Sequence, residues 1–216
     1  MLLLHGLGAS AATTWREAGW LDLLADEGRT VVAPDLPGHG ATPMPDGELD
    51  LATFALDQLP GDEPVDAVGF SLGGRTLLLA AARAPERFRR IVVAGIGANI
   101  LQPGAMHDTA DAIDAGDTEH PMARYFLDYA LRSGTDPSVL SRHLREARPP
   151  VTAGDLATLT MPVLVVIGDR DIAGPGEPLA DALPDGRCVT LPGVDHFSTP
   201  KQFGFLEAAL DFLAAP

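Results

Sequence analysis

One serine in this sequence stands between two glycines, in a setting that suits nucleophilic catalysis. Ser71 is the centre of Gly69-Phe70-Ser71-Leu72-Gly73, which follows an apolar run and precedes an alanine-rich and leucine-rich segment. A sharp turn from strand to helix would lift the hydroxyl out of a sheet, and the glycines would let both elements approach closely. The helix would then aim its amino end at an oxyanion forming beside the serine. The alternative is a serine that only caps a helix.

Four other short motifs accompany this serine along the chain. They are HGLGAS at residues 5–10, PDLPGHG at 34–40, GDRD at 168–171 and GVDHF at 193–197. Together with GFSLGG at 69–74, they resemble the α/β-hydrolase fold superfamily, in its serine-nucleophile, esterase-like branch, from the first residue nearly to the last. The resemblance implies a catalytic triad in the chain order Ser71, Asp171, His196.

The triad that the resemblance implies has a definite chemistry. Ser71 would attack an acyl carbonyl, and His196 would take its proton and pass it to the leaving group. Asp171 would fix the imidazole tautomer and stabilise the imidazolium. Two other carboxylates, Asp169 and Asp195, lie close by in sequence and compete with Asp171 for this role.

The same resemblance implies an oxyanion hole made of two backbone N–H groups. They belong to Leu72, directly after the nucleophile, and Leu7, in the loop after the first strand. We expect His5 to be a structural hydrogen-bonding residue near this loop and His39 to hold a turn. The remaining histidines fall in a helical insertion and are expected at the surface; they are His107, His120 and His143.

Short apolar runs alternate with helical segments and provide the frame for these motifs. Strands are predicted at residues 1–5, 30–34, 65–70, 90–95, 162–168 and 186–191. Several hold consecutive aliphatic residues, as is typical of parallel strands covered on both faces. Apolar residues at helical spacing predict helices at 16–27, 49–59, 72–84 and 201–214. The alternation predicts an α/β fold with a mostly parallel sheet of about six strands flanked by helices.

Residues 98–160 break this alternation. No strand is evident there, and residues 121–133 and 136–148 have the pattern of amphipathic helices. We therefore expect a core of residues 1–97 and 161–216, with residues 98–160 as a helical lid over the carboxyl ends of the strands. The lid is short for the superfamily, which favours small or medium acyl substrates.

The chain departs from its apparent relatives at its start. Most of them have an antiparallel hairpin before the strand that corresponds to residues 1–5, and that hairpin is absent here. Its loss would leave residues 30–34 at an open sheet edge, which is an aggregation liability. Either a dimer buries that edge, or other residues cover it, or the natural start lies upstream. We expect self-association, with a homodimer as its simplest form.

The composition narrows the range of partners. The 216 residues include 30 acidic and 15 basic ones, and the resulting net charge of -15 repels nucleic acids and anionic membrane surfaces. A single cysteine, Cys188, cannot form an internal disulfide, and no cysteine and histidine cluster has the spacing of a zinc site. The sequence has no pattern of a signal peptide or a membrane span. We expect a cytoplasmic protein with no metal or organic cofactor.

These observations predict a serine hydrolase that cleaves carboxylic esters of small molecules through an acyl-enzyme intermediate. The same triad also serves carbon–carbon bond hydrolases, thioesterases, lactonases, perhydrolases and a menaquinone-pathway synthase. That synthase has Gly-Gly-Arg after its serine, and residues 73–75 have the same three residue types. A serine nucleophile disfavours the haloalkane dehalogenases and soluble epoxide hydrolases, which use aspartate. A ligand-binding receptor with little turnover is the alternative from another class.

Overall fold

The strands of this protein form one parallel sheet, as the sequence predicts. A computed structural model describes residues 1–101, 106–146 and 151–215. Within these ranges the sheet has five strands in the spatial order β1-β2-β3-β4-β5, and every pair is parallel. The strands are β1 (Leu2–Leu4), β2 (Val65–Phe70), β3 (Phe88–Ala94), β4 (Val163–Gly168) and β5 (Gly186–Leu191). The predicted α/β fold is confirmed.

The sixth predicted strand, at residues 30–34, is reduced to one bridging residue. Val32 forms an isolated parallel bridge with Leu2 beyond the free edge of β1. Its carbonyl accepts a hydrogen bond from the Leu3 N–H at 2.9 Å, and its N–H donates to the Met1 carbonyl at 2.9 Å. The next N–H that could point toward β1 would be two residues further on, where Pro34 has none. The ladder therefore ends at Val32.

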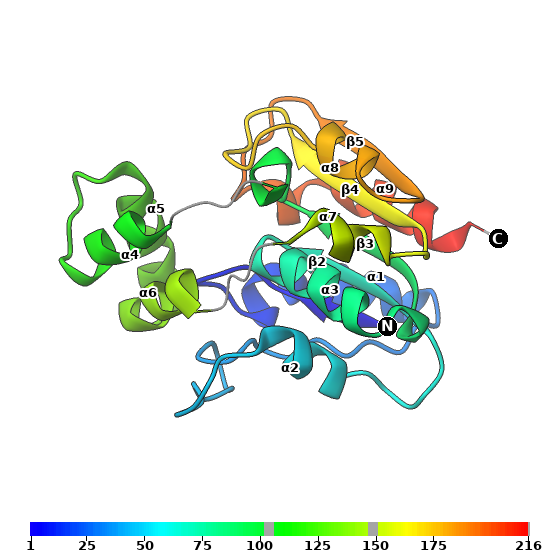
Figure 1. The fold of residues 1–216 in the computed structure, drawn as a ribbon, viewed down its shortest axis with the longest axis horizontal. Helices are drawn as coiled ribbons and strands as arrows, with labels where there is room; N and C mark the ends of the chain where they lie inside the picture. Colours follow the sequence, from blue (N-terminus) through cyan, green and yellow to red (C-terminus); the bar gives the residue numbers. More distant parts are fainter. Residues whose placement is uncertain (102–105, 147–150, 216) are drawn as a thin grey trace.

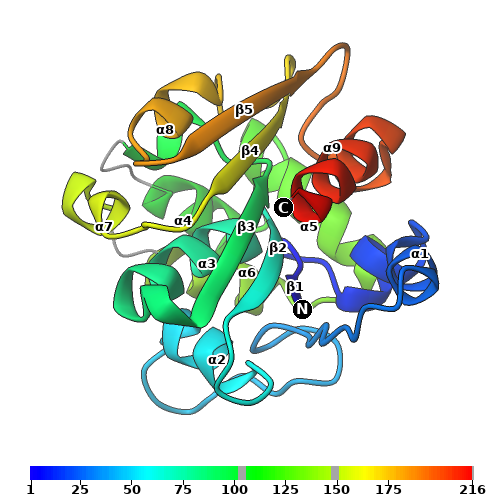
Figure 2. The same cartoon turned by 90° about the vertical axis from the view of Figure 1, so that its right-hand side faces the viewer.

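Helices cover both faces of the sheet (Figures 1 and 2). One face carries α2 (Leu51–Asp57), α3 (Leu72–Arg83), α7 (Ala153–Ala157) and α8 (Glu177–Asp181), and the other carries the π-helix η1 (Ala12–Arg16), α1 (Trp20–Asp26) and α9 (Phe203–Ala214). Strand β1 shows how both layers are held. Leu2 and Leu4 join the first apolar cluster, whereas Leu3 packs with Trp20 on the opposite face. Successive strand side chains point to opposite faces, so an uninterrupted aliphatic run is buried on both.

Most of the predicted helices are present. The helices predicted at 49–59, 72–84, 121–133 and 201–214 correspond to α2, α3, α5 (Pro121–Ser133) and α9. The helix predicted at 16–27 is shorter in the structure, because Gly19 takes a left-handed conformation (φ 79°) and α1 begins only at Trp20. Three short 3₁₀ helices complete the core; they are η2 (Pro85–Arg87), η3 (Ala98–Leu101) and η4 (Thr199–Lys201).

Three helices project beyond the carboxyl ends of the strands (Figure 1). They are α4 (His107–Asp114), α5 (Pro121–Ser133) and α6 (Pro137–Glu146), which we call the cap. Helix α4 was not predicted, and residues 147 and 148 of the predicted helix 136–148 lie outside the described residues. Helices η3 and α7 belong to the predicted lid segment but lie against the core, where the Ala98 N–H donates to the Pro175 carbonyl at 2.8 Å. Across the described ranges, no helix combines the length and apolarity needed to cross a membrane.

Candidate active site

The turn between β2 and α3 has an unusual backbone conformation. Ser71 has φ 52° and ψ −113°, and it is the one residue other than glycine with positive φ in the described chain. Such a conformation costs free energy, so the surrounding structure must hold it in place. The Ser71 side chain makes no capping hydrogen bond to α3, although it stands at the capping position. The hydroxyl is thus left available for another partner.

The glycines around Ser71 are required by close backbone contacts. A Cβ atom on Gly73 would lie 2.2 Å from the Leu4 carbonyl oxygen at the end of β1. A Cβ on Gly69 would lie 2.6 Å from the Cα of Gly74. Because no side chain fits at either position, α3 can begin directly beside the ends of β1 and β2. The motif GxSxG therefore reflects steric need in this fold.

Ser71, His196 and Asp171 form one chain of hydrogen bonds, although they come from three separate loops. His196 Nε2 lies 3.0 Å from Ser71 Oγ, and His196 Nδ1 lies 2.9 and 3.1 Å from the two oxygens of Asp171. The Asp171 side chain is fully buried. A carboxylate only accepts, so the proton of neutral His196 sits on Nδ1, and Nε2 is left to accept from the Ser71 hydroxyl.

The two competing aspartates have other partners. Asp169 Oδ1 accepts a hydrogen bond from the Gly193 N–H at 2.7 Å and so ties two loops together. Asp195 Oδ1 accepts from the Ser198 N–H at 2.9 Å, and the hydrogen bonds from Ser198 lower the pKa of the Asp195 carboxyl. Both act in turn formation, and the carboxylate that hydrogen-bonds the His196 imidazole is that of Asp171.

The loop after β1 packs directly on Ser71. A Cβ atom on Gly6 would lie 3.3 Å from Ser71 Cβ. The Gly6 carbonyl accepts from His5 Nδ1 at 2.8 Å and from the Ala9 N–H at 3.2 Å. Because a trans peptide points its C=O and N–H in opposite directions, the Leu7 N–H is turned away from these groups. It meets no backbone acceptor in the described residues.

Three buried histidines lie beneath this loop in a row. The ring centroids of His5 and His39 are 5.1 Å apart, and those of His39 and His143 are 5.0 Å apart. His5 Nε2 accepts from the Leu36 N–H at 2.9 Å, so its proton is on Nδ1. Burial lowers the pKa of His5 to about 3 and also lowers the pKa of His39. Both rings are neutral at ordinary pH.

The expectation that the insertion histidines lie at the surface is wrong for His143. Its side chain is fully buried, and its Nε2 donates to the Pro37 carbonyl at 2.8 Å. The inward face of α6 also carries the buried Leu140 and Leu144, at spacings of three and one residues from it. That helical spacing was the available signal. His107 is exposed, and His120 caps α5 through a hydrogen bond from the Ala123 N–H.

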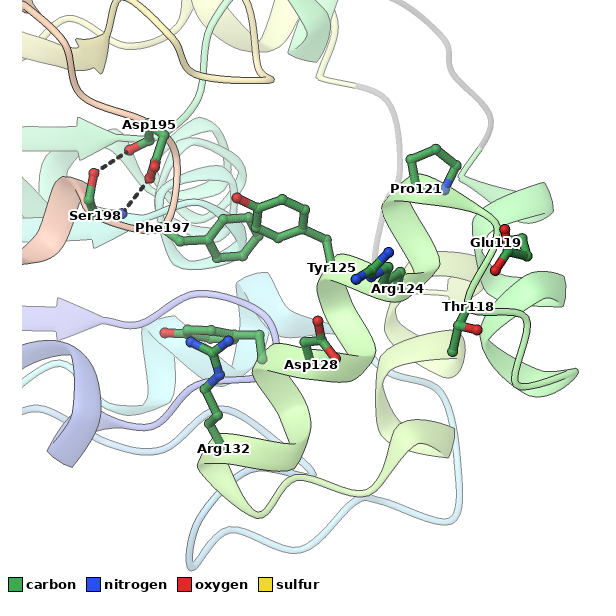
Figure 3. A pocket seen from close by; sticks show the side chains of 11 residues that line it. Thr118, Glu119, Pro121, Arg124, Tyr125, Asp128, Arg132, Asp195, Phe197 and Ser198 are labelled. Carbon is green, nitrogen blue, oxygen red and sulfur yellow. Dashed lines mark hydrogen bonds between the residues drawn. The ribbon is translucent and has the colours of Figure 1, made fainter.

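An open pocket of about 720 Å³ lies between α5 and the loop of residues 195–198 (Figure 3). Tyr125 of α5 stacks on Phe197 at a centroid distance of 4.4 Å. Phe197 follows His196 in the chain, so the pocket reaches the neighbourhood of the hydrogen-bond chain from the cap side. Ser71 itself is not among the lining residues. No group of three or more metal-binding side chains occurs in the parts of the chain that the structure describes.

Comparison with known proteins gives consistent matches. A family model described as alpha/beta hydrolase fold matches residues 1–145. The chain is 35% identical over 158 residues to the 2-hydroxy-6-oxo-2,4-heptadienoate hydrolase of Pseudomonas putida, which covers 68% of this chain and 53% of that protein. It is 28% identical over 206 residues to the pimeloyl-[acyl-carrier protein] methyl ester esterase of Nitrosomonas europaea. This match covers 78% of this chain and 80% of the esterase.

A solved structure shows the same fold. The 2-hydroxy-6-oxo-6-phenylhexa-2,4-dienoate hydrolase of Rhodococcus sp. strain RHA1 superposes with a TM-score of 0.74 at 24% identity, over 99% of this chain and 90% of that one. By contrast, the chain spans only about half the length of the Pseudomonas putida relative.

Proposed function

This chain belongs to the α/β-hydrolase fold family, and from that premise we propose that it is a serine hydrolase with Ser71 as nucleophile. The observation that carries the proposal is the continuous chain of hydrogen bonds from Ser71 Oγ through the His196 imidazole to buried Asp171. The strained backbone at Ser71 supports it, since such strain is concentrated at functional sites.

The reaction follows from the donors and acceptors of this chain. Ser71 Oγ attacks the carbonyl carbon of the substrate while its proton passes to His196 Nε2. Asp171 stabilises the imidazolium that forms, and the N–H groups of Leu7 and Leu72 bind the oxyanion. The tetrahedral intermediate collapses, the leaving group takes the proton from Nε2, and Ser71 is left acylated. Water, activated by the same imidazole, then releases the acid and restores the serine.

We assign carboxylic esters of small molecules as the substrate class. The methyl ester esterase of Nitrosomonas europaea aligns over most of both chains, which supports this assignment. A second candidate is hydrolysis of a carbon–carbon bond, because the Pseudomonas putida relative with 35% identity is named as a hydrolase of a 2-hydroxy-6-oxo-dienoate. Such a substrate contains no ester, so its hydrolysis breaks the bond between the keto carbon and the neighbouring carbon. Water adds OH to the keto carbon, which becomes an acid, and H to its neighbour.

The test compares the wild-type chain with Ser71→Ala on p-nitrophenyl esters from acetate to decanoate at pH 7 to 8. We expect turnover of the short esters and its loss in the variant. A 2-hydroxy-6-oxo-dienoate is assayed in parallel. Faster serine-dependent turnover of that compound would favour the second candidate. Absence of turnover with both substrates, or full activity of Ser71→Ala, would contradict a serine hydrolase.

A further inference from the structure

The cap makes direct contact with the loop that carries the Leu7 N–H. The Gly8 carbonyl accepts a hydrogen bond from the Ser133 hydroxyl at the end of α5, and another from the Thr135 hydroxyl at 3.3 Å. Gly134 lies between them in a left-handed conformation (φ 74°), which ends α5 and turns both hydroxyls toward one carbonyl. The two groups that hold this loop thus come from more than 120 positions further along the chain.

The same loop is also held by a histidine. The Gly8 N–H donates to His39 Nε2 at 3.0 Å. This bond requires neutral His39, whose Nδ1–H then donates to the Pro37 carbonyl at 3.1 Å. His143 of α6 donates to the same Pro37 carbonyl and packs on the His39 ring. The cap therefore also contacts His39, which accepts the hydrogen bond from the Gly8 N–H.

These contacts fix three successive peptide units. His5 holds the unit between Gly6 and Leu7, His39 holds the next one, and the two cap hydroxyls hold the third. The loop also has little room to shift toward the cap, since a Cβ atom on Gly8 would lie 3.3 Å from both Tyr129 and Leu140. The direction of the Leu7 N–H is therefore determined by groups on the core and the cap together.

We propose that the cap positions the loop after β1, which carries the Leu7 N–H. Ser133, Thr135 and His39 are the positioning residues for this N–H group. The inference rests on the proposed serine hydrolase and extends it. Packing of α5 and α6 against the core is then required for oxyanion stabilisation, and not only for enclosing the substrate. None of the three side chains contacts the reacting atoms, so each acts through the backbone of Gly8.

The first test removes both cap hydroxyls by Ser133→Ala with Thr135→Val. We expect kcat to fall by about 10-fold to 100-fold, part of the effect of deleting an oxyanion donor, with KM changed less than about twofold. The control is Ser138→Ala, which removes an exposed cap hydroxyl bonded to Asp136 and leaves Gly8 untouched. Thermal unfolding of each variant shows how much folded protein the assay contains.

The second test uses rescue at His39. His39→Leu removes the acceptor for the Gly8 N–H and should lower kcat in the same way, whereas His39→Gln offers a carbonyl oxygen in a similar place and should recover most of it. Binding of a trifluoromethyl ketone, which forms an oxyanion on Ser71, should weaken in step with kcat.

The outcomes separate this inference from the proposed function. If the wild-type chain shows no Ser71-dependent turnover, the proposed function is wrong. A wild-type chain with such turnover, and variants that keep its kcat and its affinity for the ketone, overturns the inference alone. The inference is also overturned if the loss of activity follows only the loss of folded protein and His39→Gln is no better than His39→Leu.

Discussion

The orientation of one carboxylate decides which nitrogen of His196 carries the proton. Asp171 Oδ1 accepts from His196 Nδ1 and also from the Ala173 N–H at 2.8 Å, so the carboxylate is fixed by the backbone of its own turn. In the proposed reaction the imidazole must keep Nε2 free to take the serine proton. Any group that donates toward Nδ1 would reverse the tautomer and block that step.

Asp171→Asn should therefore lower kcat by about 10⁴-fold, the size of effect seen for this change in a serine-protease triad, with little loss of folded protein. Steady-state kinetics with a short p-nitrophenyl ester measures the loss. Asp169→Asn is the matched control, because Asp169 lies two residues away and accepts a hydrogen bond from the Gly193 N–H of another loop, not from His196. Equal activity of Asp171→Asn and wild type would remove Asp171 from the triad.

At the scale of elements, the junction of β1, β2 and α3 sets the position of the nucleophile. Gly73→Ala would place a methyl group 2.2 Å from the Leu4 carbonyl oxygen. Backbone atoms must move to relieve this clash. We expect the free energy of unfolding to fall by about 3 kcal/mol or more, as for a severe overpacking change. Urea unfolding measures it. Gly47→Ala, where nothing lies within 4 Å, should be nearly neutral.

The elements also show which signals a single sequence carries. Five of the six predicted strands are present. Consecutive aliphatic residues mark burial on both faces in β1, β3 and β4, whereas most residues of the edge strand β5 are half-buried or exposed. Residues 30–34 have the same apolar pattern, yet Pro34 stops their pairing with β1 after Val32. The Ser71, Asp171 and His196 motifs could be located by resemblance. The roles of Ser133 and Thr135 could not, since their partner is a backbone carbonyl of a loop distant in sequence, which only the folded chain brings close.

For the whole molecule, the buried histidines make stability depend on pH. His5 has a folded-state pKa of about 3, and Asp35 (3.9 Å away), His39 and His143 face it. Its unfolded-state pKa is about 6.5. Below that value the unfolded chain binds a proton that the folded chain does not, so stability is complete above pH 6.5 and falls progressively toward pH 3. The lowered pKa of His39 acts in the same direction.

The expected loss from His5 alone between pH 7.5 and pH 5.5 is about 1.4 kcal/mol. Urea unfolding at the two pH values gives this difference directly. His5→Gln keeps an acceptor for the Leu36 N–H but cannot ionise, so its stability should vary less with pH even if it is lower throughout. His107→Gln changes an exposed histidine and should leave the pH dependence as in wild type. An unchanged dependence in His5→Gln would contradict the buried neutral ring.

We predict that the open edge of the sheet is where two molecules associate. In the described structure, no backbone hydrogen bond uses the N–H or C=O of Val31 or Ala33, the residues on either side of the Val32 bridge. Two copies pairing at this edge would satisfy these groups and bury the half-exposed apolar side chains, so we predict a dimer at micromolar concentration by light scattering. Thr30→Lys adds a charge at the exposed start of this edge, and pairing would bring that charge against the partner's edge and remove it from water. That variant should be monomeric, whereas Leu131→Lys, which replaces the most exposed large apolar side chain of the cap, should remain dimeric. A monomeric wild type would mean that the single bridge at Val32 followed by Pro34 is too short an edge to template pairing.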